Sequence, residues 1–131
     1  MAEGILNHMA EMKNKNISAK SAGVYAYDGN KASNNAILVM NDMGIDISNK
    51  KSNQIHRDLI EEADLILTMA NSHKEELIAR FSFAKEKIFL LNEYAHGIKK
   101  DISDPFGAEK STYREAAEEI YRAIEKIVNS N

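Results

Sequence analysis

Hydrophobic residues along the chain alternate between helical spacing and short continuous runs. Apolar positions three and four residues apart predict amphipathic helices, whereas short continuous apolar runs predict buried strands. The predicted helices are residues 1 to about 13, a helix between Ser33 and Gly44, residues 57–62, a helix opened by Ser72, and residues 112–128. The predicted strands are residues 17–24, 65–69 and 88–91, and residues 95–110 are expected to be mostly loop.

Local signals mark several helix ends. Ser33 is a good N-cap, because its hydroxyl can accept a hydrogen bond from the first helical turn. Gly44 followed by Ile45 has the pattern of a Schellman ending, with a left-handed glycine and an apolar residue packed back on the helix. Ser72 and Glu75 have the spacing of a capping box.

The order of these elements predicts the fold class. Strands that alternate with helices favour right-handed crossovers and an α/β fold, in which a parallel sheet has helices on both faces and so forms three layers. The length of 131 residues suits one domain over residues 1–131, with no linker or repeat. The chain opens on a helix, although doubly wound domains usually open on a strand and place their ligand loop after it.

Charge and composition exclude several classes of partner. Seventeen Lys and Arg against twenty Asp and Glu give a net charge of −3. We therefore expect no nucleic acid and no anionic membrane as main partner. No apolar stretch approaches the roughly 18 residues that span a bilayer. The first residues carry no basic region followed by an apolar one, so we expect no secretion and a cytoplasmic location.

Cysteine is missing from these 131 residues, which excludes disulfides, thiolate metal sites and a cysteine nucleophile within them. The histidines lack the spacing of paired metal ligands, so we interpret them as surface or turn residues and expect neither a metal nor a cofactor. They are His8, His56, His73 and His96. No P-loop or dinucleotide-binding glycine motif occurs.

The remaining candidate for chemistry is Asp104-Pro105-Phe106-Gly107. Pro105 favours an extended backbone at Asp104, so the carboxylate can project from a loop and serve as a general acid beside an aromatic ring. The same four residues also suit a plain turn, since Asp-Pro and Gly both favour turns. Local composition alone favours the turn.

Five segments, taken in order along the chain, favour the general acid over the plain turn at Asp104. They are Met1–Ile5, Ser21–Val24 followed by Gly29, Lys31 and Ala32, Ala63–Met69, Phe89–Tyr94, and Asp104–Gly107. Together they resemble the low-molecular-weight protein tyrosine phosphatase family and, within it, the protein-arginine phosphatase branch. They match its first helix, its second, third and fourth strands and its acid loop, in that order and over essentially the whole chain.

The resemblance also defines what is missing. The family's nucleophile is a cysteine in a loop of the form C-x5-R-S/T-P, between the first strand and the first helix. That loop would end just before Met1, so about 15 residues holding the strand, the cysteine and the arginine have no counterpart here. In the complete family a thiolate attacks phosphorus, and an aspartate protonates the leaving group and then activates water.

Site residues follow from the resemblance residue by residue. Asp104 is the expected acid and base, Phe106 would line the substrate slot, and Tyr25 would form its opposing wall. Ser21 would hydrogen-bond the phosphate loop from behind. The implied substrate is a phosphorylated protein side chain, either phosphotyrosine or phosphoarginine, and the Asp-Pro-Phe form leans toward the arginine branch. Without the cysteine we expect this polypeptide to be inactive.

Loss of the first strand should also affect assembly. In this family that strand lies between the segments that correspond to residues 17–24 and 65–69, so its loss costs an amount comparable with the whole stability of a domain, about 5 to 15 kcal/mol. We expect these two segments to close up directly, or another chain to fill the gap by strand exchange or homodimerisation. The alternative function is a noncatalytic binding or self-associating module on the same scaffold.

Overall fold

The structure is a computed structural model that describes residues 1–23, 32–51 and 53–130. The elements in these ranges are α1 (Ala2–Met12), α2 (Asn34–Asp42), α3 (Arg57–Glu62), β1 (Ile66–Thr68), α4 (Asn71–Arg80), the 3-10 helix η1 (Ser82–Lys87), β2 (Ile88–Leu90), α5 (Leu91–His96) and α6 (Lys110–Asn129). All the predicted helices are present, and the two later strands form over three residues each.

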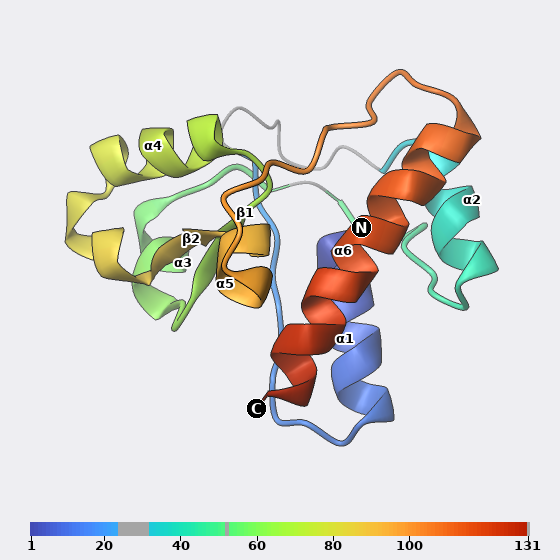
Figure 1. Cartoon of the computed structure of the whole chain (residues 1–131), viewed down its shortest axis with the longest axis horizontal. Coiled ribbons are helices and arrows are strands. Elements are labelled where there is room, and N and C mark those ends of the chain that lie inside the picture. Colours follow the sequence, from blue (N-terminus) through green and yellow to red (C-terminus); the bar gives the residue numbers. More distant parts are fainter. Residues whose placement is uncertain (24–31, 52, 131) are drawn as a thin grey trace.

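The strands β1 and β2 are parallel neighbours, with Ile66 opposite Ile88 and Thr68 opposite Leu90. The connection between them runs through α4 and η1, as a parallel crossover requires. Helices α3 and α4 lie on one side of the strand pair, and α1, α2 and α6 lie on the other (Figure 1). The α/β class with a parallel sheet between layers of helices is therefore confirmed.

The strand predicted over residues 17–24 is wrong for the part that the structure describes. Only Gly23 forms a β-bridge, with Gln54, while residues 17–22 are extended without strand pairing. The side chain of Asn7 in α1 serves the backbone of Ala19, accepting its N–H at 2.7 Å and donating to its carbonyl at 3.0 Å. A strand exists only when a neighbour pairs with it, and here α1 side chains provide those hydrogen bonds instead.

Within the described ranges, residues 17–23 make no backbone hydrogen bond to β1. The expectation that the two flanking segments close up directly is therefore wrong. Both segments keep an edge without a strand partner in this part of the chain. Whether another chain fills the gap stays a prediction.

Both end signals of α2 are confirmed. The Ser33 hydroxyl accepts a hydrogen bond from the Ala36 N–H at 3.3 Å. Gly44 takes a left-handed backbone with φ of 78°, and the Ile45 N–H reaches back to the Met40 carbonyl at 2.9 Å. These are the hydrogen bonds of the Schellman motif, with Ile45 buried against the helix.

Two predictions around α4 and α5 are wrong. Helix α4 begins at Asn71 behind Ala70, and no capping bond joins Ser72 and Glu75. Leu91, predicted as the end of a strand, and residues 95–96, predicted as loop, belong to α5 (Leu91–His96). Helix α5 starts directly after β2 because the Glu93 carboxylate accepts the Leu90 N–H at 3.3 Å, and it ends at Gly97, where φ is 70°.

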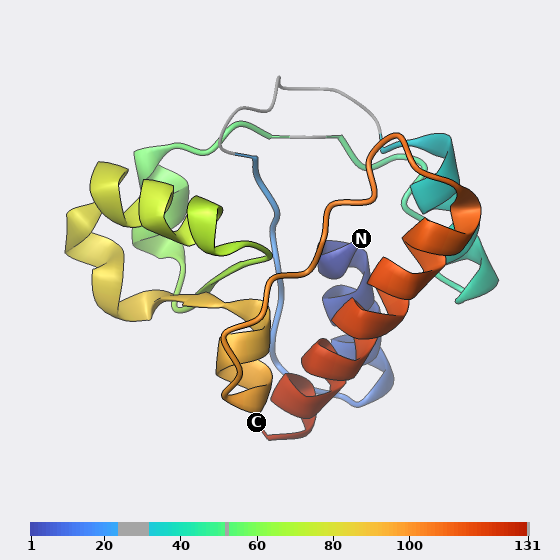
Figure 2. The ribbon, with the colours of Figure 1, turned by 45° about the horizontal axis from the view of Figure 1, so that its top comes forward.

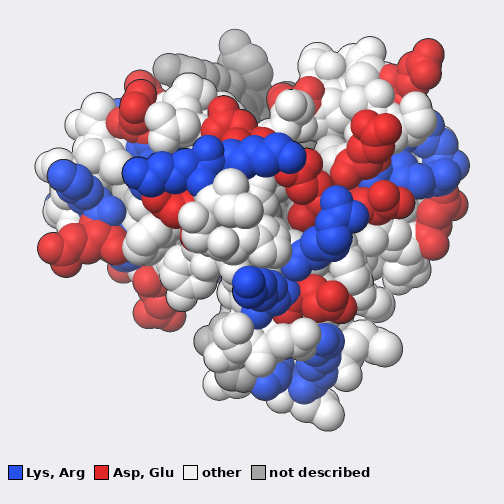
Figure 3. Space-filling model, viewed as in Figure 1, with Lys and Arg blue, Asp and Glu red and all other residues white. Residues whose placement is uncertain are grey.

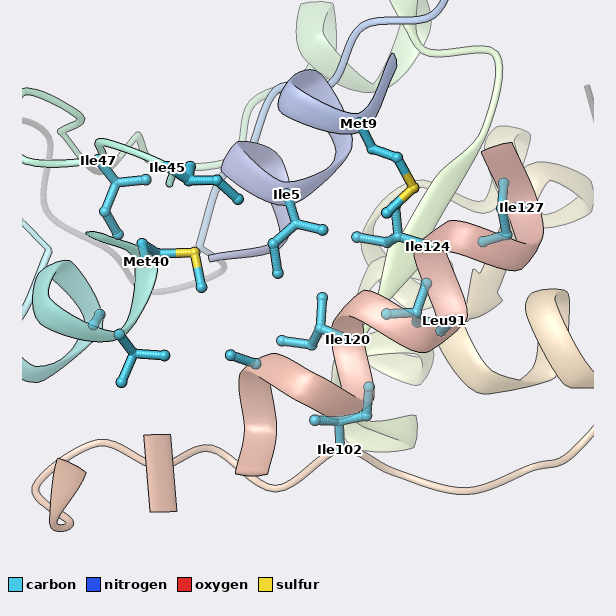
Figure 4. Packing of buried hydrophobic residues seen from close by; sticks show 14 of the residues in the cluster. Ile5, Met9, Met40, Ile45, Ile47, Leu91, Ile102, Ile120, Ile124 and Ile127 are labelled. Carbon is cyan, nitrogen blue, oxygen red and sulfur yellow. The ribbon is translucent and has the colours of Figure 1, made fainter. Parts of the chain in front are cut away.

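Two hydrophobic clusters hold these elements together. The larger, here called the α6 core, lies between α6 and the helices α1, α2 and α5 (Figure 4). The smaller, here called the Ile88 core, joins α3, α4 and η1 to β2; its buried residues are Ile60, Leu77, Phe81, Ala84 and Ile88. The α6 core contains residues from both ends of the chain, including Ile5 and Ile124.

Gly4 lets α1 approach the chain after α2 closely. A Cβ atom at Gly4 would lie 2.8 Å from the Ile47 Cγ2 atom and 3.2 Å from the Ile45 Cγ2 atom. Both isoleucines are buried in the α6 core. Glycine is therefore required here for close packing of α1.

Candidate active site

Asp104 lies in an exposed turn between α5 and α6. Its Oδ1 atom accepts the Phe106 N–H at 3.0 Å, and the Ala108 N–H donates to the Pro105 carbonyl at 2.8 Å. Gly107 completes the turn with φ of 79°. The segment is therefore a turn stabilised by its own aspartate, and the role of Asp104 as acid and base stays a prediction.

Phe106 is 82% exposed, a high value for a phenylalanine. Among the described residues it has no ring contact with another aromatic side chain. A large apolar side chain held out on a turn is free to cover a ligand that binds beside Asp104. Its predicted place in a substrate slot stays a prediction.

The segment that carries Asp104 is anchored at both ends. Before the turn, Ile102 is 4% exposed, and its N–H donates to the Met69 carbonyl at 2.8 Å. After the turn, the Asn35 side chain donates to the Ala108 carbonyl at 3.1 Å. The end of β1 and the start of α2 thus fix the two sides of the turn.

A second anchor before the turn involves Asn92, which sequence reasoning did not single out. This buried side chain in α5 donates to the Lys100 carbonyl at 3.0 Å and to Glu119 in α6 at 3.2 Å. The Lys100 ammonium also lies 3.8 Å from Glu119. A buried amide must find partners, so an asparagine beside the apolar run 88–91 was the available signal.

Asp42 at the end of α2 joins the start of α6. Its Oδ2 atom lies 3.2 Å from the Lys110 ammonium and 2.8 Å from the Arg114 guanidinium. The hydrogen bond and the charge of Lys110, followed by those of Arg114, lower the pKa of Asp42 below its usual value. The helix that follows the Asp104 turn is thereby tied to α2 by charge.

Ser21, which follows α1 in the chain, lies against the first turn of that helix. Its N–H and hydroxyl both donate to the Glu3 carboxylate, at 2.9 Å and 2.6 Å. Lys50 lies 3.4 Å from the other oxygen of the same carboxylate. The predicted role of Ser21 toward a phosphate loop stays a prediction, and within the described residues its hydroxyl is engaged by Glu3.

Met1 is half-buried and packs against the α6 core. Burial lowers the pKa of the Met1 amino group, and the Glu3 carboxylate acts in the opposite direction. In Figure 2 the end of segment 17–23 and the loop between α5 and α6 lie toward the top of the molecule, and the start of α1 lies nearer its centre. Tyr25 lies outside the described residues.

Charges of both signs alternate on the face shown in Figure 3. On the described part of the chain, several cations pair with carboxylates, as Lys74 does with Glu93 at 2.9 Å. The Lys74 hydrogen bond is the main cause that lowers the pKa of Glu93. This face therefore presents mixed pairs of charges and not one continuous basic surface.

A hollow of about 400 Å³ lies beside α3 and η1. Its lining residues are Glu61, Phe83, Ala84, Glu86 and Lys87. Neither Asp104, Phe106 nor Ser21 contributes to it. The hollow is therefore separate from the candidate site.

Residues 1–23, 32–51 and 53–130 present no candidate metal site and no candidate membrane-spanning helix. No group of three or more His, Asp or Glu side chains in them is placed to hold a metal ion. None of the helices in these ranges combines the length and apolar character of a membrane span.

Known proteins match this chain over most or nearly all of its length. Residues 1–130 match the profile of the family described as low molecular weight phosphotyrosine protein phosphatase. A protein-arginine-phosphatase of Geobacillus stearothermophilus is 36% identical over 111 residues, which cover 85% of this chain and 74% of that protein. A protein-arginine-phosphatase of Bacillus subtilis is 32% identical over 127 residues, 97% of this chain and 84% of that protein.

A solved structure agrees with these sequence matches. The low molecular weight protein tyrosine phosphatase from T. tengcongensis superposes with a TM-score of 0.95 at 37% identity, covering 99% of this chain and 88% of that chain. The predicted family resemblance and the predicted α/β fold of that family are confirmed, whereas the absence of the family's first strand stays a prediction.

Proposed function

The chain belongs to the low molecular weight phosphotyrosine protein phosphatase family, and from this premise we propose that it is the scaffold of a hydrolase for phosphorylated protein side chains. The match of residues 1–130 to the family carries the proposal, together with an anchored turn that presents Asp104. Two relatives named protein-arginine-phosphatase favour a phosphoarginine side chain, with phosphotyrosine as the other substrate.

In the proposed reaction Asp104 handles protons at the leaving group. One carboxylate oxygen holds the Phe106 N–H, so the other is the oxygen that transfers the proton. It protonates the leaving nitrogen or oxygen as the bond to phosphorus breaks, and then removes a proton from the water that hydrolyses the phospho-enzyme. Phe106 and Tyr25 form the proposed walls of the slot, and Ser21 supports the phosphate-binding segment.

The nucleophile of the proposed reaction is a cysteine thiolate, and these 131 residues contain no cysteine. We therefore propose that this polypeptide alone does not complete a turnover. A proton donor without a nucleophile cannot form the phospho-enzyme on which the second step depends.

The test compares three proteins with phosphoarginine peptide, phosphotyrosine peptide and p-nitrophenyl phosphate. The 131-residue chain should show no turnover. The same chain, extended at Met1 by a segment that contains C-x5-R-S/T-P, should hydrolyse one peptide class faster than the other. Asp104→Ala in the extended chain should lower the rate by about 10²- to 10⁴-fold, the usual contribution of a general acid.

One control variant and two contrary outcomes test the proposed phosphatase activity and the proposed inactivity of the 131-residue chain. Asp58→Ala serves as control in the extended chain, because Asp58 is an exposed carboxylate in the first turn of α3 and distant in sequence from the turn. Turnover of p-nitrophenyl phosphate by the pure 131-residue protein would refute the proposed inactivity. An extended chain that folds and hydrolyses none of the three substrates would refute the phosphatase proposal.

A noncatalytic, self-associating module is the second candidate. The observation that favours it is the pair of edges, on residues 17–23 and on β1, which make no backbone hydrogen bond to one another. Such edges can accept a strand from a second copy of this chain. Light scattering should then give a dimer mass at micromolar concentration, and a strict monomer at all concentrations would contradict self-association.

A further inference from the structure

Helix α4 begins without a cap of its own. The residue at its N-cap position is Ala70, with the extended backbone of a cap (φ −129°, ψ 148°) but no side-chain acceptor. The first N–H groups of a helix have no partner inside the helix, so they need an acceptor from elsewhere. The side chain of Ala70 cannot accept a hydrogen bond from these N–H groups.

The acceptor comes from the segment that carries Asp104. The Asp101 Oδ1 atom lies 2.9 Å from the Asn71 nitrogen and accepts the first N–H of α4 across 30 residues of sequence. A carboxylate at this position also interacts favourably with the positive end of the helix dipole. Asp101 therefore supplies the charge and the hydrogen bond that Ala70 cannot.

The next residue is fixed at the same place. Ile102 is buried, and its N–H donates to the carbonyl of Met69, the residue before Ala70. Consecutive residues of the loop thus hold the residues on both sides of Ala70. Asp104 follows two residues after Ile102, so its Cα atom lies within about 7 Å of that anchor.

We propose that Asp101 is a positioning residue, whose carboxylate caps α4 from the loop and thereby fixes the direction in which the loop presents Asp104. One anchor at Ile102 would leave the following residues free to turn about it, whereas two consecutive anchors set their orientation. This role rests on the proposed function of Asp104 as the acid. The contact itself is independent of any nucleophile.

The experiment measures loop position directly in the 131-residue protein. Because the chain contains no cysteine, Ser103→Cys and Ala79→Cys give two unique sites for nitroxide labels, one in the loop and one at an exposed position of α4. Pulsed electron paramagnetic resonance then yields the distance distribution between them. The parent protein should give one narrow peak.

Three variants in this labelled background separate positioning from helix stability. Asp101→Ala should broaden the distribution and remove the single peak. Asp101→Asn should keep the peak, because an amide oxygen can still accept the Asn71 N–H. Ala70→Asp combined with Asp101→Ala should restore the urea midpoint by giving α4 a local cap, yet leave the distribution broad.

Asp58→Ala removes another exposed aspartate near a helix start and should leave the peak unchanged. A narrow peak in Asp101→Ala would overturn the proposal. So would a narrow peak in the Ala70→Asp and Asp101→Ala double variant, since Asp101 would then act only by stabilising α4. No activity is measured, so the phosphatase proposal can fail without altering this result.

Discussion

The two hydrophobic cores differ in which parts of the chain they join. The α6 core joins helices from the beginning, middle and end of the chain, and it includes Ile102 at the base of the Asp104 turn. The Ile88 core joins neighbours in sequence, from α3 to β2. The larger core should therefore determine whether the molecule folds and where the turn lies, while the smaller one supports β2 and the C-terminal half of α4.

The largest expected effects come from truncating isoleucine in each core. Ile124→Ala and Ile60→Ala remove side chains that are each 2% exposed, and each should lower the free energy of unfolding by about 2 to 5 kcal/mol. We expect Ile124→Ala to lie near the upper limit and Ile60→Ala near the lower one, because the smaller cluster can collapse around the cavity. Urea denaturation measures both. Equal losses would break the distinction between the cores.

Gly4→Ala tests the close approach of α1 within the α6 core. Alanine normally stabilises a helix over glycine by about 0.5 to 1 kcal/mol. Here the added methyl group would lie 2.8 Å from Ile47 Cγ2, and overpacking a core costs about 1 to 3 kcal/mol. The net effect should be destabilising in thermal unfolding, and an increase in melting temperature would contradict this packing.

Removing a serine at the start of a helix should lower stability less than these core substitutions. The effect should differ between α2, which packs in the α6 core, and α4, which packs in the Ile88 core. Ser33→Ala should cost about 1 kcal/mol, because Ser33 accepts the Ala36 N–H. Ser72→Ala is the matched control in α4, where Ser72 makes no capping bond, and should change the urea midpoint far less. Similar losses in both variants would mean that the sequence-predicted cap at Ser72 forms after all.

The smallest effect is the pH dependence of the ion cluster at Asp42. Its pKa is lowered in the folded protein, so its contribution to stability is present above the unfolded pKa and is lost as pH falls through the folded value. Asp42→Asn should therefore lower the urea midpoint slightly at pH 7 and leave it unchanged near pH 2. High salt should reduce the difference at pH 7, because these charges are exposed. A difference that persists near pH 2 would contradict this account.

Signals carried by adjacent residues predicted the structure well. The Ser33 cap and the Gly44 ending depend on hydrogen bonds within a few residues, and the sequence shows both partners. The Asp104 turn is of the same kind, since its aspartate holds an N–H two residues later. Its catalytic role came from the resemblance to a family and stays a prediction.

Features that depend on distant residues were not predictable. The segment 17–22 has strand composition, but α1 side chains take its hydrogen bonds. The start of α4 at Asn71, and not at a Ser72 box, depends on Asp101 thirty residues later. Asn92 and Asn35 contact the loop from elements that the sequence does not place beside it.

The pairing of α1 with α6 has a consequence for synthesis of the protein. The two helix ends meet where Lys13 donates to Asn129, a separation of 116 residues. At a translation rate of about 5 to 20 residues per second, this delays the meeting of the two helices by on the order of ten seconds. During that time the nascent chain exposes the apolar side of its first helix, so a ribosome stalled before residue 110 should hold an aggregation-prone, protease-sensitive polypeptide.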